Sequence, residues 1–202
     1  MSGLVEIHPG AVVHSMDHLV LDLANHIGPT AYFTIYSLGL MRGVGPGRVA
    51  LLRLENQGGA VERCFGETVG LAARMQERLR AMRSEGGSVP ALGGDDAPAQ
   101  ATIRRLPSSN ETEQWLIRSD DYEIVASWSD PEPALWLSAP APAFHPTRDY
   151  VTTMVGYRHA ELVVDGTRMT GKPYVHELWQ QRLGRPFSSC HAALAETAID
   201  TS

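Results

Sequence analysis

Apolar positions between residues 60 and 83 recur every three or four residues, which is the spacing of one face of an α-helix. Arginines and glutamates fill most of the remaining positions, and Gly86-Gly87 follows as an end signal. Gly66 and Gly70 fall inside the pattern, where small residues would let another backbone approach closely. The pattern therefore predicts one long amphipathic helix over 60–83. Its apolar face would consist of Val61, Phe65, Thr68, Ala72, Met75, Leu79 and Met82.

Shorter runs rich in β-branched and aromatic residues, separated by turn residues, are typical of strands. These runs span residues 31–41, 48–56, 101–106, 113–119, 122–128, 134–139, 150–157 and 159–164. Because they follow one another without alternating helices, the sheet should be antiparallel. A short helix is expected over 174–183, and the alanines of 188–198 predict a final helix. The predicted fold class is α+β: a curved antiparallel sheet of about six to eight strands, packed on the long helix.

The length of the chain suits a single domain that spans 1–202. Residues 84–100 have the composition of a flexible loop, which would be either a linker or a lid. A curved sheet around a helix often encloses an apolar pocket. Four tryptophans would contribute either to the lining of that pocket or to the core, namely Trp115, Trp128, Trp136 and Trp179.

Composition narrows the partners and the compartment. A net charge of −6 argues against nucleic acid and against an anionic membrane surface. Cys64 and Cys190 lie in no CxxC motif, and the N-terminus shows no signal pattern, so the expectation is two reduced thiols in the cytoplasm. Every basic residue except Lys172 is an arginine, which is typical of a GC-rich bacterial genome. A homodimer is left open.

The segment HSMDHLVLDLANH, residues 14–26, interleaves histidines and aspartates with leucines. Ser15 as an N-cap and Gly28-Pro29 as a stop favour a helix over 17–27. A strand is the alternative, because the apolar and polar residues partly alternate. The strand would place Leu19, Leu21 and Leu23 on one face and His18, Val20 and Asp22 on the other.

His14 and His18 are four residues apart, a spacing that can bind zinc or iron on a helix when a distal ligand completes the set. His14 precedes the expected N-cap, however, and the other histidines show no spacing typical of metal ligands. The sequence therefore predicts neither a metal site nor a cofactor.

Two groups of residues are candidates for proton transfer. His18 and Asp22 would share one face of a strand and form a histidine–carboxylate pair. On the run 159–164, His159 and Glu161 would share a face at about 7 Å, and Tyr157 would join them. A polar outer face is the alternative there, because the apolar residues of that run point the other way.

The hexapeptide RGVGPG (42–47) follows a predicted strand and resembles the R-x-x-G-x-G pyrophosphate loop of GCN5-like acetyltransferases. The resemblance covers these residues alone. It implies a loop whose backbone N–H groups bind the CoA pyrophosphate at the N-terminus of a following helix. A Gly/Pro hairpin loop is the alternative.

These observations favour a small-molecule-processing protein of bacterial metabolism, secondary metabolism included. Its apolar pocket would support acid/base chemistry such as cyclisation, isomerisation or dehydration, and the partner would be a small organic ligand. One alternative is a non-catalytic binding protein with the same pocket. The other is a CoA-dependent acyltransferase that uses the 42–47 loop.

Overall fold

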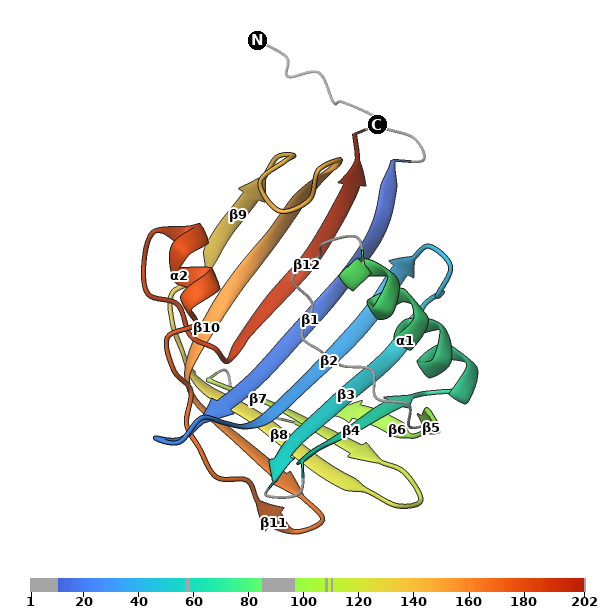
Figure 1. Cartoon of the computed structure of the whole chain (residues 1–202), viewed down its shortest axis with the longest axis vertical. Coiled ribbons are helices and arrows are strands. Elements are labelled where there is room, and N and C mark those ends of the chain that lie inside the picture. Colours follow the sequence, from blue (N-terminus) through green and yellow to red (C-terminus); the bar gives the residue numbers. More distant parts are fainter. Residues whose placement is uncertain (1–10, 57–58, 85–96, 108, 110, 202) are drawn as a thin grey trace.

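Strands make up 60% of the chain, and the described helices are two short ones, α1 (Val69–Ser84) and α2 (Glu177–Leu183). The computed structural model describes residues 11–56, 59–84, 97–107, 109 and 111–201 (Figure 1). The strands form one nearly closed, barrel-like sheet. The predicted α+β class, with a sheet packed on a long helix, is therefore wrong. Neither described helix is long and apolar enough to cross a membrane.

Ten strands follow one another in the sheet in the order β5-β4-β3-β2-β1-β12-β10-β8-β7-β6, and β9 and β11 pair with β10. All pairs are antiparallel except β4 with β5, so the sheet is mixed. The bounds are β1 (Val12–Ala24), β2 (Pro29–Met41), β3 (Gly47–Asn56), β4 (Gly59–Gly66), β5 (Ala99–Gln100), β6 (Thr102–Arg105), β7 (Thr112–Arg118), β8 (Glu123–Pro131), β9 (Leu135–Ala139), β10 (Arg148–Val164), β11 (Thr167–Arg168) and β12 (His191–Asp200).

The two ends of this strand order are adjacent in the chain. β5 pairs with β4 at one end, β6 pairs with β7 at the other, and only Ala101 lies between β5 and β6. The Ala101 amide donates to the Gly66 carbonyl at 2.8 Å, and Arg48 Nη1 donates to the Ile103 carbonyl at 3.2 Å. The backbone itself thus joins the two edges of the sheet.

The central strands are covered on both faces. One core fills the space between β1–β3 and the strands β6–β8, and it includes Leu21, Phe33 and Trp128. A second core lies between the sheet and α1 and includes Cys64 and Met75. In Figure 1 both helices lie on the near face of the sheet, and β6–β8 cross its other side. Because both faces are apolar, the two-residue alternation of these strands is blurred.

This double burial explains the error over 60–83. Residues 59–66 form β4, in which Cys64 faces the core under α1 and Phe65 faces the opposite core. Consecutive buried residues followed by a true helix produce a spacing that resembles one continuous helix. Gly66 does allow a close approach: a Cβ there would lie 2.8 Å from the Thr68 carbonyl oxygen and 2.9 Å from the Ala72 nitrogen.

Two further helix predictions are wrong for the same reason. The segment 17–27 belongs mainly to β1, as in the strand alternative, and 188–198 belongs mainly to β12. β12 lies between β1 and β10, where its alanines fit the covered middle of the sheet. Most of the predicted strands and the helix ending at Gly184 (φ 66°) are confirmed. The runs 150–157 and 159–164, however, form the single strand β10, and the sheet of the described residues has twelve strands instead of six to eight. The predicted loop 84–100 falls mostly on 85–96, outside the described residues.

Candidate functional site

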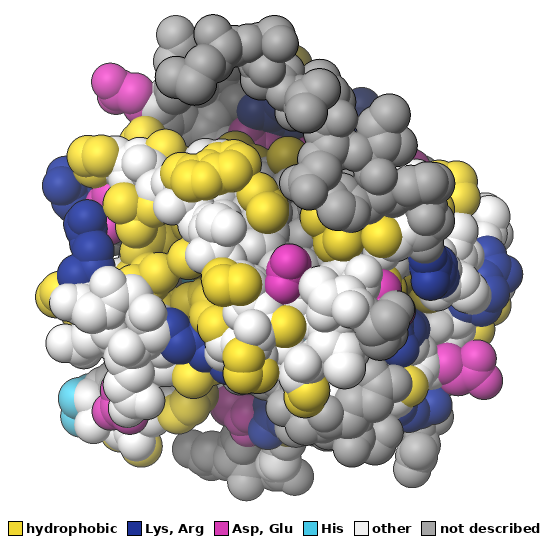
Figure 2. Space-filling model, turned by 90° about the horizontal axis from the view of Figure 1, so that it is seen from above, with side chains coloured by type: hydrophobic (Ala, Val, Ile, Leu, Met, Phe, Trp, Pro, Cys, Tyr) yellow, Lys and Arg dark blue, Asp and Glu magenta, His cyan; other side chains and the backbone are white. Residues whose placement is uncertain are grey.

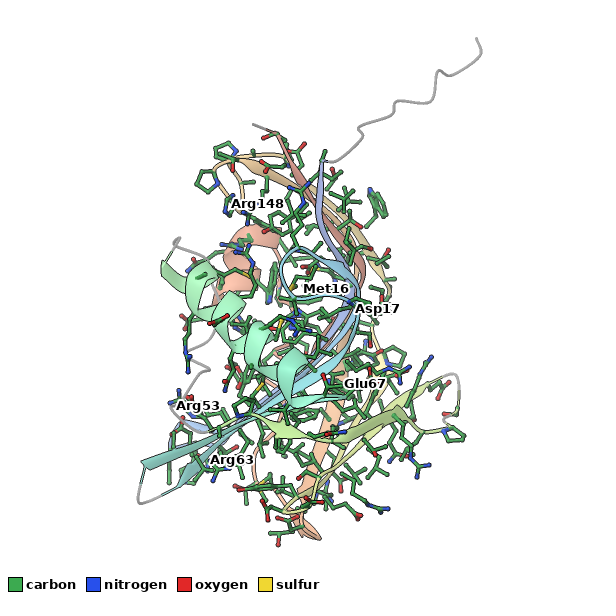
Figure 3. The ribbon with its side chains drawn as sticks, turned by 90° about the vertical axis from the view of Figure 1, so that its right-hand side faces the viewer. Met16, Asp17, Arg53, Arg63, Glu67 and Arg148 are labelled. Carbon is green, nitrogen blue, oxygen red and sulfur yellow. The ribbon has the colours of Figure 1, made fainter. Side chains whose placement is uncertain are left out.

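A cavity of about 490 Å³ lies between the sheet and the two helices. Alternate residues of β1 and its neighbours form its floor, and Figure 3 shows the alternation for Met16 and Asp17, which leave β1 on opposite sides. Side chains of α1, α2 and the segment 144–148 form the walls. The lining consists of Met16, His18, Val20, Asp22, Tyr32, Tyr36, Met41, Met75, Leu79, Met82, Leu137, Phe144, His145, Arg148, Tyr150, Thr152, Met154, His176, Leu178, Trp179, Arg182, His191, Ala193 and Glu196.

Methionine is concentrated around this cavity: five of the seven methionines of the chain line it. A thioether side chain is unbranched and polarisable, so it adapts its shape to an apolar ligand. The volume falls within the range of about 300–1,000 Å³ that is common for small-molecule sites. Seen from above, hydrophobic side chains gather across the middle of the molecule, and Lys and Arg lie mainly at the sides (Figure 2).

His18 lies in the middle of the floor. Its ring stacks on Tyr36 of β2, with 4.3 Å between centroids, and Tyr36 is its register partner. Burial lowers the pKa of His18 to about 4, although Glu196 acts in the opposite direction. Its Nε2 is buried and has no hydrogen-bond partner among the described residues. At neutral pH the cavity therefore contains an uncharged imidazole with one free ring nitrogen.

His191 is a second buried imidazole, on β12 opposite Val20. Burial, with a smaller contribution from His18 and His176, lowers its pKa to about 3. Its ring packs edge-on against Trp179 of α2 at 5.7 Å. The floor and the α2 wall are thus connected through an aromatic contact.

Glu196 is a partly buried carboxylate of the floor. His14 Nε2 lies 3.0 Å from Glu196 Oε1, and the two residues come from the neighbouring strands β1 and β12. Burial raises the pKa of Glu196, but the His14 hydrogen bond and the nearby His18 and His14 rings outweigh it and hold the pKa below its usual value. Glu196 therefore remains ionised at neutral pH.

Asp22 is the carboxylate at the other end of the floor. The Tyr174 hydroxyl donates to Asp22 Oδ2 at 2.7 Å. The backbone of Asp22 is also held, because its carbonyl accepts from Ser189 Oγ at 2.7 Å and its amide donates to Cys190 Sγ at 3.3 Å. Burial raises the pKa of Asp22, while Tyr174 and His176 act in the opposite direction. A fixed carboxyl group with a raised pKa is a stronger base than an ordinary aspartate and suits proton transfer.

The structure brings His18 and Asp22 to one cavity but does not pair them. Four residues of strand correspond to about 13 Å, and each side chain has its own partner, Tyr36 or Tyr174. They could therefore act on two ends of one ligand. Their catalytic roles remain predictions.

The second predicted group lies elsewhere, on the far half of β10. The His159 side chain is 74% exposed, and its Nε2 lies 3.8 Å from Asp130 Oδ2. Glu161 forms an ion pair with Arg168 at 3.0 Å. Tyr157 is half-buried and lines a separate surface groove. The three side chains are thus remote from the cavity, and their roles also remain predictions.

Sequence reasoning missed Tyr174, Glu196 and the contribution of His191. All three reach the site through pairings between β1 and the last thirty residues, a relationship that local patterns do not show. The helix predicted over 188–198 would give His191 no partner on β1, whereas the observed strand pairs it with Val20.

Other chemistry finds less support. No group of three His, Cys, Asp or Glu side chains in the described part of the chain could hold a metal ion. RGVGPG forms the turn between β2 and β3, and a strand follows it, so the helix N-terminus implied by the acetyltransferase resemblance is not there. Catalysis through a lysine imine does not fit the cavity, because the only lysine, Lys172, is outside its lining.

Comparisons with known proteins identify no family. No protein-family model matches the chain, and no curated protein matches it. Among solved structures it is similar to acetoacetate decarboxylase from Legionella pneumophila, at 9% identity and a TM-score of 0.42, over 100% of this chain and 90% of that chain. A likeness at this level carries no information about activity.

Proposed function

We propose that the cavity binds a small organic molecule and that Asp22 and His18 transfer protons on it. The observation that carries this proposal is the set of titratable groups on one apolar floor whose environments shift their pKa values in different directions. Burial raises the pKa of Asp22 and lowers that of His18 to about 4. Both shifts favour the uncharged form of the group, and perturbed titratable groups that share one cavity are typical of functional sites.

Asp22 would be the general base. Its raised pKa makes it a stronger base than an exposed aspartate, and Tyr174 fixes one carboxyl oxygen at 2.7 Å. Tyr174 is the only hydrogen-bond donor to this carboxyl group within the described ranges, which leaves Oδ1 for the ligand. The neutral His18, with its free Nε2, would hydrogen-bond the ligand about 13 Å along the strand and polarise it.

This arrangement suits a reaction that removes a proton at one position of a ligand and returns one at another. Isomerisation, dehydration and cyclisation belong to this class. The test is to incubate the purified protein with a small-molecule extract of its source cells in D₂O. Mass spectrometry would then search for a consumed compound and for a product in which deuterium replaces hydrogen. Apart from this label, the product would have the composition of the consumed compound, or that composition less one water.

Four variants make the test specific. Asp22→Asn should reduce turnover by about 100-fold or more, and His18→Gln by about tenfold or more, which are typical contributions of such groups. Asp121→Asn and His159→Gln are the matched controls, because both residues are exposed and outside the cavity. Full turnover by Asp22→Asn would overturn the assignment of the base.

The non-catalytic alternative rests on a specific observation. His18 and Asp22 make no mutual contact, and methionines dominate the apolar part of the lining. A binding protein would release its ligand chemically unchanged, with no deuterium incorporated, and Asp22→Asn would bind that ligand as tightly as the wild type.

A further inference from the structure

Arg182 places a positive charge in the helical wall of the cavity. It lies in the last turn of α2, and its guanidinium carbon is 4.4 Å from the centroid of the Phe144 ring and 5.8 Å from that of Trp179. Residues from α2 and from the segment before β10 thus hold the group between two aromatic rings. This packing orients the guanidinium plane without using its N–H donors.

Arg182 forms no ion pair with a carboxylate of the described residues. The side chain of Arg182 is exposed overall, and the part that the two rings cover is enough to lower its pKa through desolvation. A guanidinium carries five N–H donors in a planar fork, which matches the two oxygens of a carboxylate. Within the described part of the chain this fork is unused by a carboxylate, so it is open to an anionic ligand.

A second arginine, Arg148, lines the same cavity at the start of β10. A hydrogen bond links it to Tyr150, and Figure 3 shows it on the same side of β1 as Met16. The part of the cavity under α1 is apolar instead and is lined by side chains such as Met75 and Leu79. A ligand that fits both would carry one charged end and an apolar body.

We infer that the cavity takes a hydrophobic monocarboxylic acid, whose carboxylate binds Arg182 and whose apolar body lies against the methionines. The inference rests on the proposed function, because it names the ligand class of the same cavity. A single negative charge fits best, since the ionised Glu196 on the floor would repel a second one. The carboxylate end then lies by α2, and the remainder of the molecule reaches the floor that holds His18 and Asp22.

The experiment compares decanoate with 1-decanol by isothermal titration calorimetry at pH 7.5. The two probes share the same alkyl chain and differ in charge. Decanoate should bind wild-type protein at least about tenfold more tightly than decanol, which is the usual gain from a charge-assisted pair. Arg182→Gln should abolish this preference and leave decanol binding unchanged.

Arg185→Gln is the matched control, because Arg185 is exposed just beyond α2 and outside the cavity lining. Arg182→Lys keeps the charge and loses the planar fork, so it should retain only part of the preference. Thermal unfolding of each variant verifies that it is folded. If a folded Arg182→Lys variant loses the preference for decanoate completely, the result still supports binding of the carboxylate by the planar guanidinium. If it keeps the full preference, that part of the inference is wrong.

The outcomes separate the two proposals. Equal binding of decanoate and decanol, or a preference that survives in Arg182→Gln, would overturn the anion inference and leave the cavity as a ligand site. Failure of both probes to bind, together with no turnover in the extract, would overturn the proposed function itself. A preference lost equally in Arg182→Gln and Arg185→Gln would indicate general electrostatics and also overturn the inference.

Discussion

The hydroxyl of Tyr174 donates a 2.7 Å hydrogen bond to the carboxylate of Asp22, across 152 residues of sequence. Tyr174 precedes α2, and Asp22 lies near the end of β1, so the bond ties the helical wall of the cavity to its floor. It also stabilises the ionised carboxylate, because the Tyr174 hydroxyl donates its proton to a carboxylate oxygen. One contact thus controls both the position and the basicity of the candidate base.

Tyr174→Phe should raise the pKa of Asp22 further, because the variant removes a bond that holds it down while burial remains. A base must be ionised to act, so the acidic limb of the pH–activity profile should move to higher pH. ¹³C NMR titration of the Asp22 carboxyl measures the same shift without a substrate. Tyr157→Phe, on the other groove, should leave both curves in place. An unchanged Asp22 titration in Tyr174→Phe would refute the coupling.

Stability should fall as the pH falls, and His18 should be one cause. The unfolded chain protonates this imidazole below pH 6.5, but the folded chain does so only below about 4. The unfolded state therefore binds more protons between these values, and stability that is complete above pH 6.5 is lost as the pH falls through this window. The loss is on the order of 3 kcal/mol. Denaturant titrations at pH 7.0, 5.5 and 4.5 measure it.

His18→Gln should reduce the slope of that pH dependence, because it removes one of the buried groups. His159→Gln is the control, since its side chain is 74% exposed and should leave the slope unchanged. His191, whose pKa burial lowers to about 3, should retain part of the dependence in His18→Gln. Identical slopes in wild type and His18→Gln would contradict the account.

His14→Ala should destabilise the fold by about 2 kcal/mol, because it leaves the Glu196 carboxylate, whose side chain is only 18% exposed, without its hydrogen-bond partner. The double variant His14→Ala/Glu196→Gln should recover part of this loss, since a neutral amide is less costly to bury than a charge. Urea denaturation measures each variant. His26→Ala, at an exposed position, should change the free energy of unfolding by less than about 0.5 kcal/mol. Additive losses in the double variant would disprove the pairing.

Gly66→Ala and Gly70→Ala should have opposite signs. At Gly66 a Cβ would meet backbone atoms of the α1 start at 2.8 and 2.9 Å, so alanine should cost about 2 kcal/mol or more. At Gly70 the nearest atom is the flexible Arg74 side chain at 3.4 Å, and alanine is the better helix former. Thermal and urea unfolding of both variants test the contrast. Equal effects would show that the close approach of α1 is not tight.

Local patterns indicated the strands that are bounded by turn residues. The predicted run 159–164, for example, ends at the turn Asp165-Gly166, where both residues have positive φ. Local patterns failed where a strand is covered on both sides. In β4, Cys64 and Phe65 are both buried, and in β12 His191, Ala192 and Ala193 are all buried, so neither strand alternates. Because both strands lie in segments that were predicted as helices, the predicted fold class was wrong as well.

The site was accessible from sequence only in part. His18 and Asp22 stood out because two polar groups lie among leucines on one alternating face. Tyr174 and Glu196 could not be found in this way, because they join Asp22 and His14 through pairings that are 152 and 182 residues apart. Arg182 required the aromatic rings of two other segments to define its surroundings.

The pairing of β1 with β12 places Val12 beside Ile199 and Val20 beside His191. Strand pairs between such distant segments form slowly, because the intervening chain loses conformational entropy before the stabilising contacts are made. The floor of the cavity lies on this ladder, so no partly folded chain that lacks it can hold a ligand there. During refolding, ligand binding should therefore begin only after β1 has paired with β12. A bound ligand would in turn stabilise this pairing.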